Sequence, residues 1–202
     1  MLNTLFLNPP SYNGYDGGAG SRYQCTREVK SFWYPTWLAQ LAALVEGSRL
    51  IDAPARGIII EDILPLAKEY ELLVLYTSTP SFPNDVKIAE VFKYENQNLI
   101  IGFCGAHVAI NPDHCILASN AIDFVAGNEF DFTIKEIAEG KILEQIDGLT
   151  YKKDNKPIHN KPRALIEDMD SLPWVTKAYK DNLVTSDYYN GYMLHPYMSF
   201  YT

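Results

Sequence analysis

The sequence predicts an α/β fold, a doubly wound (Rossmann- or flavodoxin-like) five-stranded parallel sheet with a C-terminal β-hairpin and linker extension. Three observations predict it. Short apolar runs alternate with segments of helical apolar spacing between residues 2 and 139. The runs are apolar on both faces, which is typical of parallel strands covered by helices on each side. Loops rich in Gly, Ser, Thr and Pro follow the strands.

The predicted elements alternate regularly along the chain. Strands are expected at residues 2–7, 48–54, 71–76, 98–103 and 121–126. Helices are expected at residues 33–45, about 60–67, 83–94, 113–118 and 132–139, and Pro65 is expected to bend the second of these. Strand–helix alternation of this kind places the strands parallel, with right-handed crossovers.

The C-terminal part has a different character. Apolar segments at 146–151 and 157–160 flank a polar stretch and predict a β-hairpin. Residues 166–174 show neither helical nor strand-like spacing of apolar side chains and predict a tether. Five tyrosines in the last fifteen residues are expected to pack against a further domain: Tyr188, Tyr189, Tyr192, Tyr197 and Tyr201. The apolar ending predicts that the chain continues beyond Thr202. We therefore expect a Rossmann-like domain at 1–142, and a hairpin and linker at 143–202.

Composition narrows the class of protein. The 202 residues are 47% hydrophobic, and 25 acidic against 17 basic side chains give a net charge of −8, which argues against a partner with a phosphate backbone such as a nucleic acid. No apolar run approaches the roughly 20 residues that a membrane span needs. The start lacks the basic region of a secretory signal. Three irregularly spaced cysteines (Cys25, Cys104 and Cys115) fit a reducing compartment, so a cytoplasmic location is predicted.

Familiar catalytic and metal motifs are missing. The sequence contains no P-loop and no Gly-x-Ser-x-Gly elbow, and Gly18-Ala19-Gly20 has Tyr23 where a dinucleotide fingerprint needs its third glycine. A nucleotide-binding Rossmann enzyme is therefore a less favoured alternative. Cys104, His107, His114 and Cys115 match no usual zinc spacing, so no metal ligand is predicted and the cysteines are expected to be buried.

The candidate site lies in the loops that follow the strands, because open α/β sheets bind ligands at the carboxyl ends of their strands. Hydroxyls at 77–81 suit both a helix cap and a polar ligand, and His107 is expected to point into the cleft. The candidate cofactor-binding residues are Asn8, Pro9, Thr77, Ser78, Thr79, Ser81, Gly105, Ala106, His107, Val108, Gly127, Asn128 and Glu129.

These loops, in this order, resemble the cobalamin-binding domain of radical S-adenosylmethionine enzymes. The residues that carry the resemblance are Leu5-Phe6-Leu7-Asn8-Pro9-Pro10, Ser78-Thr79-Pro80-Ser81, Gly105-Ala106-His107-Val108 and Gly127-Asn128-Glu129-Phe130. Segments 147–151, 160–163 and 169–173 resemble the linker before the catalytic barrel. The resemblance implies that cobalamin and the chain's own C-terminal radical domain are its partners. It also implies that the [4Fe-4S] cluster and S-adenosylmethionine belong to that missing domain. No catalytic residue is assigned here, because the three cysteines lack the cluster spacing.

The resemblance also implies how cobalamin is held. Methionine-synthase-type domains carry a cobalt-ligating His after the first strand, but residues 8–14 contain none, so base-off cobalamin without a protein His ligand is expected. The nucleotide tail is expected near 77–81 and 105–108, with 127–129 along the rim. A bulky residue at Gly105 is expected to block retention without unfolding the domain.

Three further segments are similar to a hopanoid-biosynthesis radical enzyme, which would make the substrate of the whole protein a lipid: residues 16–24, 31–40 and 131–136. The magnesium-protoporphyrin IX monomethyl ester cyclase type shares the architecture and is the competing assignment. A non-catalytic, flavodoxin-like interaction module is the alternative from a different class.

Overall fold

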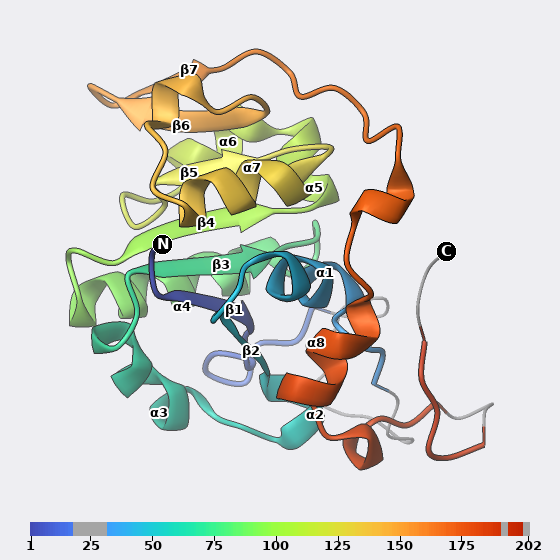
Figure 1. Ribbon diagram of the computed structural model, residues 1–202. Helices are drawn as coiled ribbons and strands as arrows, with labels where there is room; N and C mark the ends of the chain where they lie inside the picture. Colours follow the sequence, from blue (N-terminus) through green and yellow to red (C-terminus); the bar gives the residue numbers. More distant parts are fainter. Residues whose placement is uncertain (18–31, 191–193, 200–202) are drawn as a thin grey trace.

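The computed structural model describes residues 1–17, 32–190 and 194–199. Its core is a seven-stranded sheet with the order β2-β1-β3-β4-β5-β6-β7, covered by helices on both faces (Figure 1). The strands are β1 (Thr4–Asn8), β2 (Arg49–Asp52), β3 (Leu72–Tyr76), β4 (Ile100–Cys104), β5 (Phe124–Ala126), β6 (Leu149–Lys153) and β7 (Lys156–His159).

Strands β1 to β5 are parallel, as predicted, and their order reverses between β1 and β3. The predicted hairpin also forms, but it joins the same sheet, because β6 pairs antiparallel with β5 through Val125 and Thr150. The fold class is thus confirmed, with seven strands in the sheet rather than five. The parallel arrangement brings the carboxyl ends of β1 to β5 to one edge, which we call the carboxyl edge.

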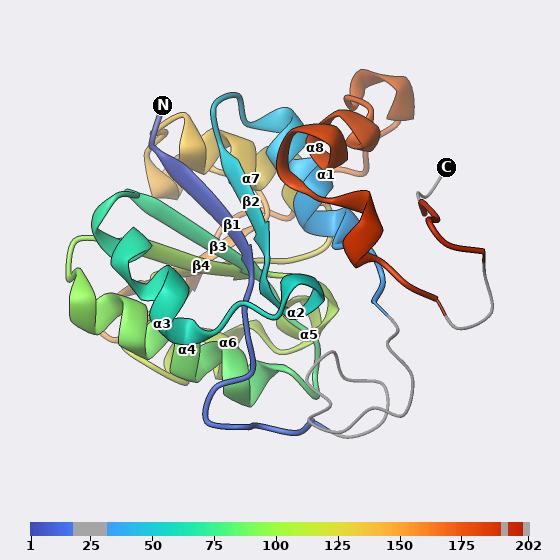
Figure 2. The same ribbon diagram turned by 90° about the horizontal axis from the view of Figure 1, so that it is seen from below.

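Two helical layers bury the sheet (Figure 2). Helices α1 (Thr36–Leu44), α7 (Phe130–Ala138) and α8 (Val175–Asn182) cover one face, where Leu38, Ile134 and Tyr179 enter the core. The other face is covered by α3 (Ile60–Ile63), α4 (Phe82–Glu95), α5 (Ala106–Ile110) and α6 (Pro112–Leu117). Among the described residues, none of the helices is both long and apolar enough to cross a bilayer.

Several elements differ from the prediction. The helix expected at about 60–67 is α3 followed by a 3-10 segment, η1 (Leu64–Lys68), which Pro65 explains because proline lacks the donor of a regular α-helix. Helices α2 (Ala53–Arg56), α5 and α8 were not predicted. Three further 3-10 segments lie in the C-terminal part of the described chain: η2 (Leu143–Gln145), η3 (Met169–Ser171) and η4 (Thr185–Asp187).

Two of the five C-terminal tyrosines, Tyr188 and Tyr197, pack inward, contrary to the expectation that the group contacts a further domain. Tyr188 is 1% exposed and stacks on Tyr34 with ring centroids 3.9 Å apart. Tyr197 is buried beside the same ring. Only Tyr189 is exposed among the described members of this group, and Tyr192 and Tyr201 lie outside the described residues. These aromatic residues show no helical or strand-like spacing in the sequence because long-range packing, rather than a regular element, buries them.

Candidate functional site

The loops after β3, β4 and β5 lie together at the carboxyl edge. The Thr77 backbone N–H donates to the Cys104 carbonyl over 2.9 Å, and Thr79 Oγ1 lies 3.1 Å from His107 Nδ1. The β5 loop approaches α5, because a Cβ on Gly127 would lie 3.1 Å from the Ala109 Cα. The sequence placed these three loops at one site, and the structure brings them together.

The β1 loop is fixed to the same edge through α4. Asn84 is buried there, and its side-chain N–H donates to the Pro10 carbonyl over 3.1 Å. Its oxygen accepts from the Tyr12 N–H over 2.7 Å. The Tyr15 hydroxyl donates to the Pro80 carbonyl in the β3 loop. Sequence reasoning did not identify Asn84, because it lies inside a helix rather than in a loop.

Gly105 allows the β3 and β4 loops to meet. Its φ is +112°, and a Cβ would lie 2.7 Å from the Thr77 carbonyl oxygen and 2.9 Å from the Tyr76 ring. Any L side chain there is strained whether or not a ligand binds. A bulky residue at Gly105 is therefore expected to strain the fold itself as well as the proposed site, so loss of retention in such a variant would not report on the site alone.

Burial divides the candidate residues into two groups. Pro9, Thr77, Ser81, Gly105 and Val108 are buried and build the loops; Ser81 Oγ, for example, lies 2.9 Å from Ser78 Oγ. The remaining candidates are partly or fully exposed at the carboxyl edge: Asn8, Ser78, Thr79, Ala106, His107, Gly127, Asn128 and Glu129. Only the second group of candidates therefore presents accessible surface at the carboxyl edge.

His107 has a buried nitrogen that lacks a partner. Its Nδ1 is within hydrogen-bond distance of Thr79, but its Nε2 is buried with no partner among the described residues. The ring packs 4.7 Å from the Phe82 ring. Burial, and then the nearby His114, lowers the pKa of His107, so the neutral imidazole is favoured. Because an unpaired buried polar atom costs stability, Nε2 marks a position where a ligand's polar group would be stabilising.

An aromatic ledge borders these loops on the α1 side. Trp37 and Tyr76 stack with ring centroids 6.4 Å apart, and Tyr76 contacts Phe130 edge-on at 6.2 Å. Trp37 is 46% exposed although it lies in a helix that covers the sheet. The helical apolar spacing at 33–45 gave no sign that Trp37 would be exposed, so this surface was missed.

Asp131 is a second group that sequence reasoning missed. It lies in the first turn of α7, directly after the β5 loop. Burial raises its pKa to about 6, and the negative charge of Glu129 adds to this effect. Asp131 therefore changes charge close to neutral pH beside the candidate site.

The end of β2 adds a buried carboxylate to the carboxyl edge. Asp52 is 2% exposed and accepts from Asn8 Nδ2 over 2.6 Å and from the Tyr188 hydroxyl over 2.7 Å. The expected strand at 48–54 ran past Asp52, so its end was not placed among the candidate loops. The rule that selected Asn8 would have selected Asp52 had the strand end been placed correctly.

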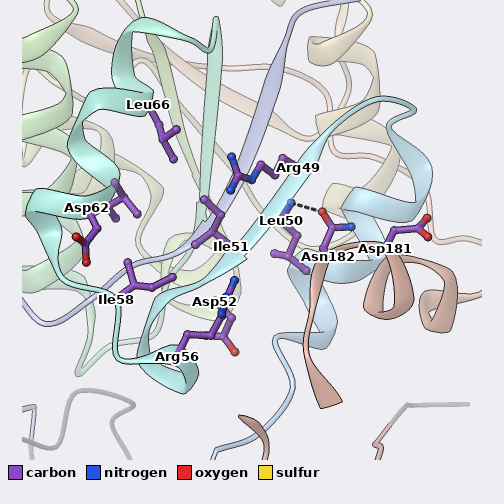
Figure 3. A pocket seen from close by; sticks show the side chains of 11 residues that line it. Arg49, Leu50, Ile51, Asp52, Arg56, Ile58, Asp62, Leu66, Asp181 and Asn182 are labelled. Atoms are coloured by element: carbon purple, nitrogen blue, oxygen red, sulfur yellow. Dashed lines mark hydrogen bonds between the residues drawn. The ribbon is translucent and has the colours of Figure 1, made fainter. Parts of the chain in front are cut away.

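A cavity of about 520 Å³ lies beside the edge strand β2 (Figure 3). None of the thirteen predicted site residues lines it, although Asp52 does. Arg56 on its rim faces Asp187 at 3.6 Å. Its lining residues are Arg49, Leu50, Ile51, Asp52, Arg56, Ile58, Asp62, Ile63, Leu66, Asp181 and Asn182.

The described residues contain no group of three or more His, Cys, Asp or Glu side chains placed to hold a metal ion. Cys104 and Cys115 are buried, and burial raises the pKa of both thiols, so they behave as small apolar residues, as expected. Cys25 and the Gly18-Ala19-Gly20 segment with Tyr23 lie outside the described residues.

The fold is a Rossmann-like α/β module whose carboxyl edge includes the point where the strand order reverses, between β1 and β3. No protein-family model matches the sequence. The chain is similar to an uncharacterised methyltransferase of Pyrococcus horikoshii, 31% identical over 148 residues, which cover 69% of this chain and 32% of the relative.

The structure is similar to TsrM, a radical S-adenosylmethionine methyltransferase from Kitasatospora setae. TsrM with cobalamin and a [4Fe-4S] cluster bound matches with a TM-score of 0.59 and 14% identity, over 84% of this chain and 30% of TsrM. TsrM with tryptophan substrate and a S-adenosylmethionine analogue bound gives a TM-score of 0.58 and 14% identity, over 80% and 30%. This likeness shows a shared fold. The chain spans about a third of the length of these relatives.

Proposed function

We propose that this chain is the cobalamin-binding module of a cobalamin-dependent radical S-adenosylmethionine enzyme. The observation that carries the proposal is the buried His107 Nε2 without a described partner, at the junction of the loops after β3 and β4. A polar group on the cofactor would satisfy this nitrogen. The TsrM match supports the proposal at the level of the fold, since one of its structures holds cobalamin.

In this proposal the corrin ring lies over the carboxyl edge and the nucleotide tail lies beside Thr79 and His107. Hydroxyls of Ser78 and Thr79 and the backbone at Asn128 supply polar contacts, and the aromatic ledge supplies a flat apolar one. When bound, cobalamin supplies the organometallic chemistry of cobalt. The protein holds and orients it.

The cofactor is proposed to bind base-off without a protein His on cobalt. Residues 8–14, where methionine-synthase-type domains carry the cobalt-ligating His, contain no His, and His107 lies in a different loop, after β4. We assign His107 to the nucleotide tail rather than to the metal on this ground.

The [4Fe-4S] cluster, S-adenosylmethionine and the chemical step are assigned to a C-terminal domain that follows a hairpin and linker at 143–202, with cobalamin held by 1–142. The name of the Pyrococcus relative favours methyl transfer as the reaction of the whole protein. A hopanoid side chain remains the proposed lipid substrate, with a magnesium-protoporphyrin cyclase-type reaction as the alternative. The proposed compartment is the cytoplasm.

The experiment is retention of hydroxocobalamin after desalting, read from the visible spectrum, for the wild type and His107→Leu. Leucine fills the site beside Phe82 and removes the unpaired nitrogen, so we expect the apo protein to keep its stability. Retention of hydroxocobalamin is expected to fall at least about fivefold, because the cofactor loses a buried hydrogen bond to His107. The matched control is His114→Leu, because His114 faces the same Phe82 ring at 5.8 Å but is not a candidate site residue.

Retention by the wild type and the His114 variant, but not by the His107 variant, supports the proposal. A folded wild type that stays colourless would overturn it and favour the non-catalytic interaction module.

A further inference from the structure

One buried carboxylate joins the candidate site to the C-terminal end of the described chain. Asp52, at the end of β2, accepts from Asn8 on the site side and from Tyr188 on the other. In Figure 3, Asp52 lies between Arg56 and the β2 backbone at one end of the cavity. A carboxylate accepts but never donates, so both neighbours must turn their donors toward it.

This constraint fixes which way the Asn8 amide faces. Because Asn8 Nδ2 donates to Asp52, Asn8 Oδ1 is left as an acceptor, and no described residue bonds it. Hydrogen bonds to a charged, buried acceptor are stronger than neutral ones, and losing one leaves an unpaired buried group. Asp52 therefore sets the orientation of a residue that the proposed function places against cobalamin.

Tyr188 belongs to a segment that is hydrogen-bonded to the residues just before α1 and to α8. We call residues 188–190 and 194–199 the strap. The Phe32 N–H donates to the Tyr189 carbonyl over 2.7 Å, and the Tyr34 hydroxyl donates to the Tyr197 carbonyl over 2.9 Å. Tyr179 on α8 donates to the Ser199 carbonyl over 3.0 Å. The strap is thus closed by tyrosine hydroxyls and by one backbone hydrogen bond.

The Tyr188 hydroxyl is a permanent donor. Burial raises its pKa, and the charge of Asp52 raises it further, so the phenol stays protonated throughout the physiological range. Its ring stacks on Tyr34 and is 1% exposed, which leaves the hydroxyl little freedom to turn elsewhere.

We propose that Asp52 is a positioning residue that couples the cofactor edge to the strap: Tyr188 holds Asp52, and Asp52 holds Asn8 in the orientation that receives cobalamin. The hydrogen bonds from Tyr188 to Asp52 and from Asn8 to Asp52 stand on the structure. That the ligand at Asn8 is cobalamin rests on the proposed function. By linkage, cobalamin that uses Asn8 stabilises the closed strap to the same extent that the closed strap raises cobalamin affinity.

The test compares Tyr188→Phe with Tyr197→Phe. Each variant removes one strap hydroxyl, but only the Tyr188 hydroxyl reaches Asp52; the Tyr197 hydroxyl donates to the Phe32 carbonyl. The first readout needs no cofactor. It is the side-chain amide signal of Asn8 in the ¹H–¹⁵N spectrum of the apo chain, assigned by its loss in Asn8→Ala. The signal is expected to shift in the Tyr188 variant and not in the Tyr197 variant.

The second readout is the Kd for hydroxocobalamin, with exchange of the Phe32 N–H as a monitor of strap closure. We expect the Kd to rise about three- to tenfold in Tyr188→Phe, within the usual range of coupling between sites, and less than about twofold in Tyr197→Phe. Cobalamin is expected to slow exchange at Phe32 in the wild type and less so in the Tyr188 variant. If Tyr188→Phe does not fold, Asp52→Asn replaces it, with the same expectations.

An Asn8 signal that responds equally to both variants, or a Kd that stays at the wild-type value while the signal shifts, would overturn the coupling. Failure of the wild type to bind cobalamin would instead overturn the proposed function. In that case the Asn8 signal alone still decides whether Tyr188 positions Asn8.

Discussion

The Cα of Gly105 lies so close to the backbone of Thr77 that a Cβ on Gly105 would stand 2.7 Å from the Thr77 carbonyl oxygen. This approach joins the loops after β3 and β4 and gives the carboxyl edge its shape. We therefore expect Gly105→Ala to lower the free energy of unfolding by about 2–4 kcal/mol, from the clash and the positive φ together. Chemical denaturation measures it.

Gly14→Ala is the matched control, because Gly14 also has a positive φ, and no atom of the described residues lies within 4 Å of the added Cβ. It is expected to cost about 1 kcal/mol, the backbone term alone. Equal losses in the two variants would contradict the close approach of the loops.

Asp131 predicts a pH dependence of stability. Its pKa is raised from 3.8 to about 6 in the folded chain, so the native state holds its proton at pH values where the unfolded state has lost it. Stability therefore falls as pH rises from about 4 to about 6 and stays lower above that range. Asp131→Asn removes the penalty, and we expect a gain of up to about 3 kcal/mol at pH 7 that vanishes near pH 4.

Denaturation of both proteins from pH 4 to pH 8 checks this expectation. Asp181→Asn, at an exposed position of α8 far from Asp131 in sequence, is the control for a general change of net charge. A constant difference between wild type and Asp131→Asn across this range would show that burial does not raise the pKa of Asp131.

The aromatic ledge makes a prediction of its own. Trp37→Ala removes the exposed half of the Trp37–Tyr76 stack, so we expect hydroxocobalamin retention to fall at least about threefold while stability changes by roughly 1 kcal/mol. Trp174→Ala is the control, because Trp174 is 80% exposed at the start of α8 and has no described contact with the ledge. Equal retention in both variants would remove the ledge from the site.

The sequence predicted the carboxyl edge well because one rule governs it. Apolar runs locate the parallel strands, and the polar residues that follow them, such as Thr79 and His107, must then share an edge. Those two residues lie 28 positions apart in sequence, yet their side chains are 3.1 Å apart. The rule says which residues meet but not which of them are buried, so Thr77 and Ser81 were indistinguishable from Ser78 and Thr79.

What sequence reasoning missed depends on distant contacts. Asp52 and Tyr188 lie 136 positions apart, and no period relates them. Tyr188 is buried because its ring stacks on Tyr34, just before α1, beside Tyr179 of α8. The sequence pattern predicted a tether at 166–174 and no helix after it, so α8 was not expected. The apolar spacing that predicted a helix at 33–45 did not distinguish Trp37, which lies in the first turn of α1 and is 46% exposed, from the buried apolar residues of the same helix.

The carboxyl edge is proposed to hold base-off cobalamin without a histidine on cobalt. The most direct measurement is the electron paramagnetic resonance spectrum of cob(II)alamin mixed with the wild-type chain. Bound cofactor is expected to lose the nitrogen splitting that the coordinated nucleotide base gives in free cob(II)alamin. A spectrum that keeps this splitting, whether from unbound cofactor or from a histidine ligand, would contradict the claim.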